Sequence, residues 1–278
     1  MAAEDRHLSA KVVWVTGSSR GIGRVIAAHL GSLGADLVVH GTTPTSTQAF
    51  GEGNSLAEVT REIADECGVR ALPVHGDLTD EATVKSIAAQ VREEFGRIDI
   101  LINCAGGDIG AAGTGAPLAG KPPQNDAVFI ALDDIRTVLE RNVMTCILCC
   151  REVAPEMMER KAGHIVNIGS NAALFGATNS AIYGTAKAAV HEYTRCLADL
   201  LRPYNVTANV IAPGEIETPR FLASRVIDED MRLEGGTMVR YGQPLEVARA
   251  VEFMVSEKNT YITGQVLRVD GGTQIWPA

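Results

Sequence analysis

Residues 11–23, which read KVVWVTGSSRGIG, decide the fold class of this 278-residue chain. The first six, Lys11–Thr16, form a nearly continuous run of apolar and β-branched side chains, which predicts a buried strand. A glycine-rich turn follows, and a helical pattern then covers Arg24–Leu33. A strand, a tight turn and a helix in this order are the start of a βαβ unit.

Strand and helix patterns alternate along the rest of the chain. Further strands are expected at Asp36–His40, Arg70–Val74, Ile98–Asn103, His164–Gly169, Val206–Ile211 and Gln265–Val269. Helices are expected at Ser55–Cys67, Asp80–Phe95, Leu132–Arg160, Ala181–Arg202 and Pro244–Ser256, with a kink or break at Pro155. This alternation predicts a single α/β domain over residues 1–278. It is of the doubly wound Rossmann type, with a mostly or fully parallel seven-stranded sheet and helices on both faces.

The charge balance disfavours two kinds of partner. The chain has 25 Lys+Arg against 34 Asp+Glu, a formal net charge of −9. Nucleic acids and acidic membrane surfaces bind basic proteins, so neither is expected here. Residues 1–11 lack the apolar core of a signal peptide, and no apolar run reaches the roughly 18–20 residues of a membrane span. We therefore expect a cytoplasmic protein.

The cysteines give no sign of a disulfide or metal site. Six cysteines in a chain without a secretory signal are expected to be reduced thiols. Cys146, Cys149 and Cys150 have metal-ligand spacing, but a structural zinc needs four ligands and no second Cys or His pair is nearby. We expect buried thiols there and no metal.

The glycine-rich turn predicts a dinucleotide site. Glycines allow the backbone to turn sharply and approach a pyrophosphate, while the helix N-terminus offers free N–H groups. The residues expected at this turn are Gly17, Ser19, Gly21, Ile22 and Gly23. An ordinary glycine-rich βα turn is the alternative. A P-loop is excluded because no Gly-Lys-Ser/Thr follows.

The choice between NAD and NADP depends on the tip of the second strand. That tip reads Gly41, Thr42, Thr43, and offers no carboxylate for the ribose hydroxyls. Arg20, inside the glycine turn, can reach a 2′-phosphate, although a solvated loop charge is the alternative for it. NADP(H) is therefore the expected cofactor, with NAD(H) as the alternative.

Two further loops fit the same ligand. Asp77 and Leu78 follow the third strand, where an adenine would lie, although Asp77 could equally cap the next helix. Asn103, Ala105 and Gly106 follow the fourth strand, where small residues allow the backbone to approach a cofactor.

A candidate catalytic pair lies on one expected helix. Tyr183 and Lys187 are four residues apart, so their side chains share a face. A nearby ammonium favours the phenolate and lowers the tyrosine pKa, so such a pair can exchange a proton with an alcohol or ketone oxygen. Ser170, at the end of the fifth strand, can hydrogen-bond the same oxygen.

Several motifs now stand in a recognisable order. They are TGSSRGIG at 16–23, NCAG at 103–106, RNVM at 141–144, IVNIGS at 165–170, YGTAK at 183–187, NVIAPGEIET at 209–218 and VDGG at 269–272. With them the chain resembles the short-chain dehydrogenase/reductase family from Lys11 to Gly272. Cys104 is a mild departure, since the family usually has NNAG at this loop.

The resemblance implies roles for particular residues. Tyr183 would be the general acid/base, and Ser170 would orient the substrate oxygen. Lys187 would lower the tyrosine pKa and bind the nicotinamide ribose, and Asn142 would hold a water in a proton relay. Four residues would line the nicotinamide end, namely Pro213, Gly214, Ile216 and Thr218. The family commonly forms dimers and tetramers, so a homo-oligomer is expected.

Two segments depart from the family or surround its substrate. Asn103 and Asn142 are 39 positions apart, a longer connection than the family generally has. The surplus, residues 107–126, is either a disordered surface insertion or a loop that enters the substrate cleft. Residues 215–235 correspond to the family's substrate lid. Their acidic side chains either form a solvated surface or repel anionic substrates, which would suit a polyol.

Together these features predict an NADP(H)-preferring oxidoreductase that interconverts a secondary alcohol and a ketone on a small, polar or polyol-like substrate. The first alternative is a 3-oxoacyl thioester reductase, although an acidic carrier protein would require a basic docking surface. The second alternative is a non-catalytic dinucleotide-binding sensor or scaffold, which would not need Asn142, Ser170, Tyr183 and Lys187 together.

Overall fold

A seven-stranded parallel sheet forms the centre of the computed structural model, which describes residues 6–232, 236–273 and 275. Its strands lie in the order β3-β2-β1-β4-β5-β6-β7, and every adjacent pair is parallel. The strands are β1 Val12–Thr16, β2 Asp36–Gly41, β3 Ala71–His75, β4 Ile100–Asn103, β5 Gly163–Ile168, β6 Val206–Pro213 and β7 Val266–Val269. The predicted Rossmann-type fold class is confirmed.

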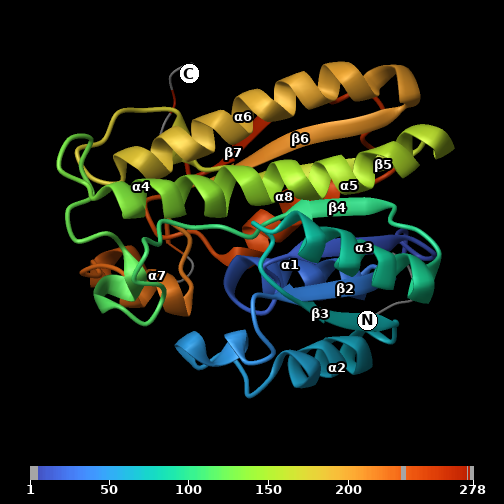
Figure 1. The fold of residues 1–278 in the computed structure, drawn as a ribbon, viewed down its shortest axis with the longest axis horizontal. Coiled ribbons are helices and arrows are strands. Elements are labelled where there is room, and N and C mark those ends of the chain that lie inside the picture. Colours follow the sequence, from blue (N-terminus) through green and yellow to red (C-terminus); the bar gives the residue numbers. More distant parts are fainter. Residues whose placement is uncertain (1–5, 233–235, 274, 276–278) are drawn as a thin grey trace.

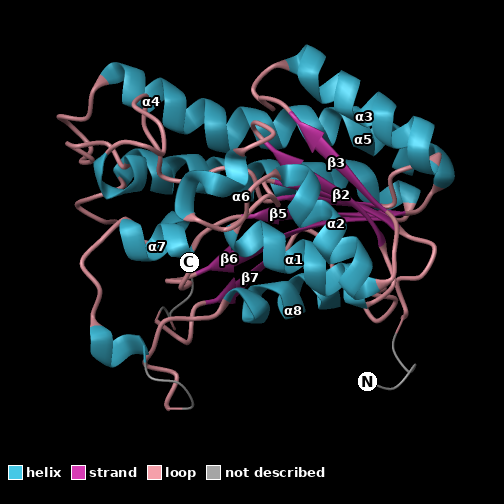
Figure 2. Ribbon diagram, turned by 90° about the horizontal axis from the view of Figure 1, so that it is seen from below, coloured by secondary structure: helices cyan, strands magenta, loops and turns pink. Residues whose placement is uncertain are grey.

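Helices cover both faces of this sheet. They are α1 Gly21–Ser32, α2 Leu56–Cys67, α3 Glu81–Phe95, α4 Leu132–Leu139, α5 Thr145–Arg160, α6 Ala181–Leu201, α7 Pro219–Ala223 and α8 Pro244–Val255. Figure 2 shows α3 and α5 on one side of the strands and α1 and α8 on the other. Along β1, Trp14 packs into the cluster with α3 and α5, while Val13 and Val15 pack with α1 and α8. Burial on both faces explains why β1 is a continuous apolar run.

The strand order reverses direction beside β1. The chain goes outward from β1 to β2 and β3, then returns to β4 on the other side of β1 (Figure 1). The loops that leave β1 and β4 therefore diverge at the same edge, which is where doubly wound sheets bind ligands. Register places Thr16 opposite Asn103, so the glycine turn and the NCAG loop begin side by side.

The segment expected as one kinked helix has its irregularity elsewhere. α5 continues through Pro155 to Arg160, so the predicted break does not occur. Instead, a π-helical segment, Glu140–Met144, joins α4 to α5. Such π-turns widen a helix by one residue and often occur at functional sites. Here the π-turn carries Asn142.

Residues 107–126 are held by specific hydrogen bonds. Asp108 accepts from Asn125 Nδ2 and from Ser180 Oγ, both at 2.7 Å. Gly110 N donates to Gly120 O at 2.9 Å, which closes the loop on itself. The loop therefore packs against the start of α6, in contrast to a disordered insertion.

The described residues contain neither a membrane-spanning helix nor a metal cluster. None of the described helices is both long and apolar enough to cross a bilayer. Within the same residues, no three His, Cys, Asp or Glu side chains gather as metal ligands. All six cysteines are free, and Cys146, Cys149 and Cys150 are buried, as the sequence predicted.

Candidate active site

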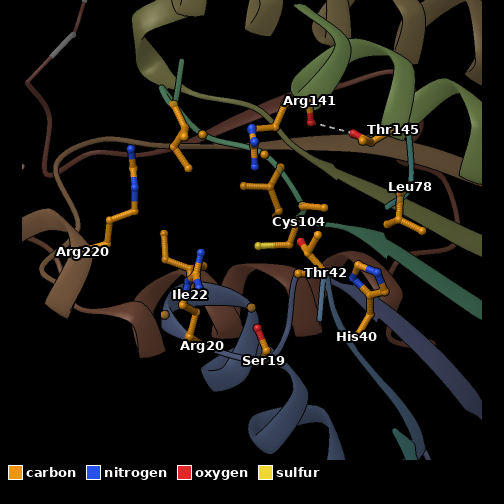
Figure 3. A pocket seen from close by; sticks show the side chains of 18 of the residues that line it. Ser19, Arg20, Ile22, His40, Thr42, Leu78, Cys104, Arg141, Thr145 and Arg220 are labelled. Carbon is orange, nitrogen blue, oxygen red and sulfur yellow. Dashed lines mark hydrogen bonds between the residues drawn. The ribbon is translucent and has the colours of Figure 1, made fainter. Parts of the chain in front are cut away.

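A cavity of about 360 Å³ lies at the carboxyl ends of the strands (Figure 3). Most of the residues predicted for the cofactor and for catalysis lie on its wall: Gly17, Ser19, Arg20, Gly21, Ile22, Gly23, Gly41, Thr42, Asp77, Leu78, Ala105, Gly106, Ser170, Tyr183, Lys187, Pro213, Gly214 and Thr218. Four predicted residues, Thr43, Asn103, Asn142 and Ile216, are not on this wall. The sheet thus brings together residues that are up to 201 positions apart in the chain.

The glycine turn has no room for side chains. A Cβ at Gly23 would lie 2.4 Å from the carbonyl oxygen of Gly17, and one at Gly17 would lie 2.8 Å from the Cα of Ala105. Gly17 also has a positive φ of 66°, which favours glycine. This close backbone packing opens the cradle above α1 and fits the pyrophosphate of a dinucleotide.

His40, on β2, holds the glycine turn through a hydrogen bond to its backbone. Its Nδ1 accepts a hydrogen bond from Gly17 N at 3.0 Å, and its Nε2 donates to the carbonyl oxygen of Gly76 at 3.1 Å. The ring therefore has to be the neutral Nε2–H tautomer. Burial lowers the pKa of His40 to about 4, which keeps the ring neutral.

Two of the predicted residues away from the cavity have structural partners. Asn103 Nδ2 donates to Asn167 Oδ1 at 2.8 Å, so this side chain joins β4 to β5 below the cavity. Ile216 is buried and forms an isolated bridge with Gly242. Thr43 is exposed on the loop after β2. Their contact with a cofactor remains a prediction.

A carboxylate that the sequence did not predict lies at the cofactor end of the cavity. Glu52 Oε2 accepts a hydrogen bond from Gly21 N at 2.6 Å, and its Oε1 is buried without a partner among the described residues. Glu52 lies far beyond the tip of β2 in sequence and reaches the turn because a 3₁₀ turn, Ser46–Phe50, folds the chain back. The site therefore has a carboxylate although the strand tip has none.

Two arginines accompany Glu52. Arg20 Nη1 donates to Ser46 O at 2.6 Å, and the guanidinium lies 5.2 Å from the ring centre of Phe50. Burial lowers the pKa of Arg20, while Glu52 raises it. Arg141, on the π-helical segment, also reaches the cavity wall (Figure 3). The motif RNVM contains Arg141 but does not predict that its side chain reaches the cavity, because that position depends on the π-turn.

Asp77 has a local structural role as well as its place on the wall. Its Oδ1 accepts from the backbone N of Thr79 at 3.0 Å and from Thr79 Oγ1 at 2.9 Å. The N-cap of α3 is Asp80, whose side chain accepts from Thr83 N. Asp77 therefore shapes the turn before α3 and does not cap the helix.

Ser170, Tyr183 and Lys187 converge at the other end of the cavity. Lys187 Nζ donates to the carbonyl oxygen of Ile168 at 2.8 Å and lies 5.8 Å from the ring centre of Tyr183. Burial raises the pKa of Tyr183, whereas a hydrogen bond with Ser170 lowers it by a smaller amount. Tyr183 is a neutral phenol in this structure and can donate a proton, and the lowering of its pKa by Lys187 remains a prediction.

Asn142 uses its side chain to position the loop after β4. Its Nδ2 donates to Gly107 O at 2.9 Å and to Val138 O at 2.8 Å, and its Oδ1 accepts from Gly107 N at 2.9 Å. Both ends of the amide are thus bound to the protein. The water relay remains a prediction, and the side-chain contacts assign Asn142 a positioning role.

Known proteins with similar sequences identify the family to which this chain belongs. A family model described as short chain dehydrogenase matches residues 11–226. Cyclohexanol dehydrogenase of Rhodococcus sp. (strain TK6) is 37% identical over 275 residues, which cover 95% of this chain and 96% of that protein. A 3-oxoacyl-(acyl-carrier-protein) reductase of Aquifex aeolicus (strain VF5) is 33% identical over 270 residues, covering 95% and 98%.

A solved structure has the same fold and holds a nicotinamide cofactor. It is 7α-hydroxysteroid dehydrogenase in complex with NADH and 7-oxo glycochenodeoxycholic acid, with a TM-score of 0.80, 28% identity, and coverage of 98% of this chain and 97% of that one. The chain belongs to the short-chain dehydrogenase family and is an oxidoreductase of that type.

Proposed function

We propose that this protein interconverts a secondary alcohol and a ketone with a nicotinamide dinucleotide as the hydride carrier. The observation that carries the proposal is one cavity that holds the glycine turn at one end and Ser170, Tyr183 and Lys187 at the other. The 37% identity to a cyclohexanol dehydrogenase supports a small substrate with an alcohol or keto group. We propose a small polar substrate.

The chain's own residues would position the reactants and move the proton. The glycine turn and the N-terminus of α1 would hold a pyrophosphate, and Lys187 would bind the nicotinamide ribose. The bound dinucleotide supplies or accepts the hydride. Tyr183, a neutral phenol in this structure, donates its proton to the ketone oxygen, and Ser170 hydrogen-bonds the same oxygen as negative charge develops there.

We propose NADP(H) as the preferred dinucleotide. Arg20 supports this preference, because its guanidinium lies at the cofactor end and is held by Ser46 and Phe50. Glu52 acts against it, since a carboxylate repels a 2′-phosphate. Fluorescence titration with NADPH and NADH tests the balance, and tighter binding of NADH would overturn the preference.

The alternative substrate class is a 3-oxoacyl thioester. The 33% identity to a 3-oxoacyl-(acyl-carrier-protein) reductase favours it, whereas the net charge of −9 disfavours docking of an acidic carrier. Reduction of an acetoacetyl thioester with NADPH separates the two, because efficient turnover would favour the thioester. A non-catalytic sensor is supported only if a broad panel of alcohols and ketones gives no turnover.

We further propose a single domain over residues 1–278, in which residues 215–235 are a lid that meets loop 107–126 over the substrate. Residues 233–235 of this lid lie outside the described residues. The contact from Arg220 Nη2 on α7 to Asp108 O at 2.7 Å supports this arrangement. We also propose a homodimer or homotetramer in the cytoplasm, with no nucleic-acid or membrane partner.

Replacement of Tyr183 with Phe tests the central proposal. The variant loses the only proposed proton donor, so turnover should fall at least about 100-fold while dinucleotide binding is retained. Steady-state kinetics with a ketone panel and calorimetric titration of the dinucleotide measure the two effects. Full activity of this variant on the best substrate would refute the mechanism.

A further inference from the structure

Arg220 is the cation on the cavity wall that no sequence motif explains. It is the second residue of α7, and Figure 3 shows its side chain reaching into the cavity, on the side away from His40. The same wall has three other described cations, Lys187, Arg20 and Arg141. Lys187 Nζ is bound to Ile168 O and Arg20 Nη1 to Ser46 O. Of the three arginines on this wall, Arg220 is the one whose charge acts on Tyr183, so it is the cation best placed for a substrate.

The guanidinium of Arg220 has only partial compensation from the protein. Its Nη2 donates to two backbone carbonyl oxygens of loop 107–126, Asp108 O at 2.7 Å and Ala119 O at 3.5 Å. Its Nε is buried and has no partner among the residues that the structure describes. Within the described ranges, no carboxylate oxygen forms an ion pair with Arg220, whereas Arg225 and Arg232 of the same segment each pair with a glutamate. The charge of Asp108 acts on Arg220, but the hydrogen bonds of the guanidinium go only to carbonyl oxygens, so an anion that binds it directly adds strong stabilisation.

Asp108, the acidic side chain whose charge acts on Arg220, does not take the place of such an anion. Asp108 is 5% exposed, and its Oδ2 is occupied by Asn125 and Ser180 at 2.7 Å each. Asp108 is not on the cavity wall, whereas Arg220 is. An incoming ligand therefore meets the guanidinium and not the carboxylate.

Arg220 also acts on the site of proton transfer. Its charge lowers the pKa of Tyr183, and the charge of Asp108 raises it. Both effects require that the two charges lie near the phenol. A ligand group bound by Arg220 would thus be part of the same small molecule whose oxygen meets Tyr183.

The sequence left open whether the acidic side chains of the lid repel anionic substrates, and two of these side chains are paired in the structure. Glu215 pairs with Arg225 at 2.5 Å, and Glu217 pairs with Arg232 at 3.1 Å. Each of these two carboxylates is therefore neutralised by an arginine of the same segment. The predicted repulsion of anionic substrates is weak near the cavity.

We propose that Arg220 binds a carboxylate of the substrate, so that the enzyme acts on oxo acids and the corresponding hydroxy acids. The proposal rests on the proposed alcohol–ketone activity and narrows its substrate class. The carboxylate takes no part in bond changes: the carbonyl carbon gains the hydride, and the carbonyl oxygen gains the Tyr183 proton. Arg220 is a specificity-determining residue because it recognises a group away from the reacting carbon.

Two matched pairs of ketones test the proposal at two chain lengths. They are acetoacetate with methyl acetoacetate and 4-oxopentanoate with its methyl ester, each reduced with NADPH and with NADH. For at least one of the two pairs, we expect kcat/KM for the acid to exceed that for its methyl ester by at least about tenfold. Arg220→Met should lower kcat/KM for the acid by about 10–100-fold and change that for the ester by less than about threefold.

Two further variants separate charge from structure. Arg220→Lys keeps the positive charge and should retain part of the preference for the acid, even where Arg220→Met unfolds. Arg195→Met is the control, because it removes a positive charge from an exposed side chain of α6 that pairs with Glu192 and is off the cavity wall. This control should leave the acid-to-ester ratio unchanged. Equal activity on acid and ester, or an equal loss on both in the Arg220 variants, would overturn the proposal.

A binding measurement keeps this inference distinct from the activity itself. Acetoacetate and 4-oxopentanoate are titrated by calorimetry into the Tyr183→Phe protein with dinucleotide, with and without Arg220→Lys and Arg220→Met. Binding that depends on Arg220 supports the inference even if the parent protein turns over neither acid, in which case the alcohol–ketone proposal alone fails. The inference is overturned if neither acid binds the Tyr183→Phe protein, or if the Arg220 substitutions leave the binding of both acids unchanged.

Discussion

Replacement of His40 with Asn tests whether burial of this ring couples stability to pH. His40 is 2% exposed and neutral, with one nitrogen accepting from Gly17 N and the other donating to Gly76 O. Asn can still offer an acceptor to the glycine turn, but it does not titrate. The difference between the parent protein and His40→Asn therefore isolates the protonation of one side chain.

The magnitude follows from the two pKa values. The His40 pKa is about 4 in the folded protein, below its ordinary value of 6.5, so protons bind the unfolded chain first as the pH falls. The contribution of His40 to the free energy of unfolding is fully present above about pH 6.5 and is lost as the pH falls towards about 4. Between about pH 7.5 and about pH 5 the loss is about 2 kcal/mol.

The assay is urea unfolding of both proteins at one fixed protein concentration, monitored by circular dichroism across this pH range. The stability advantage of the parent over His40→Asn should shrink by about 2 kcal/mol between about pH 7.5 and about pH 5. The constant part of the difference reflects the lost hydrogen bond to Gly76 and does not depend on pH. A difference that stays level within about 0.5 kcal/mol would show that His40 titrates equally in both states and refute the reasoning.

Two more substitutions test the cofactor end. Gly23→Ala should weaken dinucleotide binding at least about tenfold in calorimetric titration, because its Cβ would lie 2.4 Å from Gly17 O. Gly115→Ala is the control, since its Cβ would meet no atom within 4 Å. An equal effect of both substitutions would contradict the packing argument. Glu52→Gln keeps an acceptor for Gly21 N but removes the charge, so the ratio of NADPH to NADH affinity should rise about three- to tenfold in fluorescence titration. An unchanged ratio would mean that Glu52 does not act on the 2′-position.

Local sequence patterns predicted the parts of the site that lie within single elements. The β1 strand and the turn after it were recognisable because a strand buried on both faces is apolar throughout and because Gly23 cannot carry a Cβ there. Tyr183 and Lys187 were recognisable because a helix places residues four apart on one face. Residue order along the chain was enough in each case.

Local patterns failed where the conformation of a connection decides the geometry. The helix expected over Leu132–Arg160 was predicted to kink or break at Pro155, but the irregular segment is the π-turn at Glu140–Met144, which sends Arg141 to the cavity. Glu52 reaches Gly21 only because the chain after β2 turns back. No short-range sequence pattern encodes the π-turn or the turn of the chain after β2.

The sequence by itself determined the family, the parallel sheet, the glycine turn and the set of residues that would move a proton, because each depends on periodicity or on motifs in order. Only the tertiary structure decided the electrostatics of the cavity. Burial raises the pKa of Tyr183, an effect that adjacency to Lys187 alone does not reveal. Arg220 and Asp108 both act on that phenol because α7 and loop 107–126 meet at the hydrogen bond from Arg220 to Asp108 O. Electrostatic interactions depend on distance and burial in three dimensions, and neither follows from spacing along the chain.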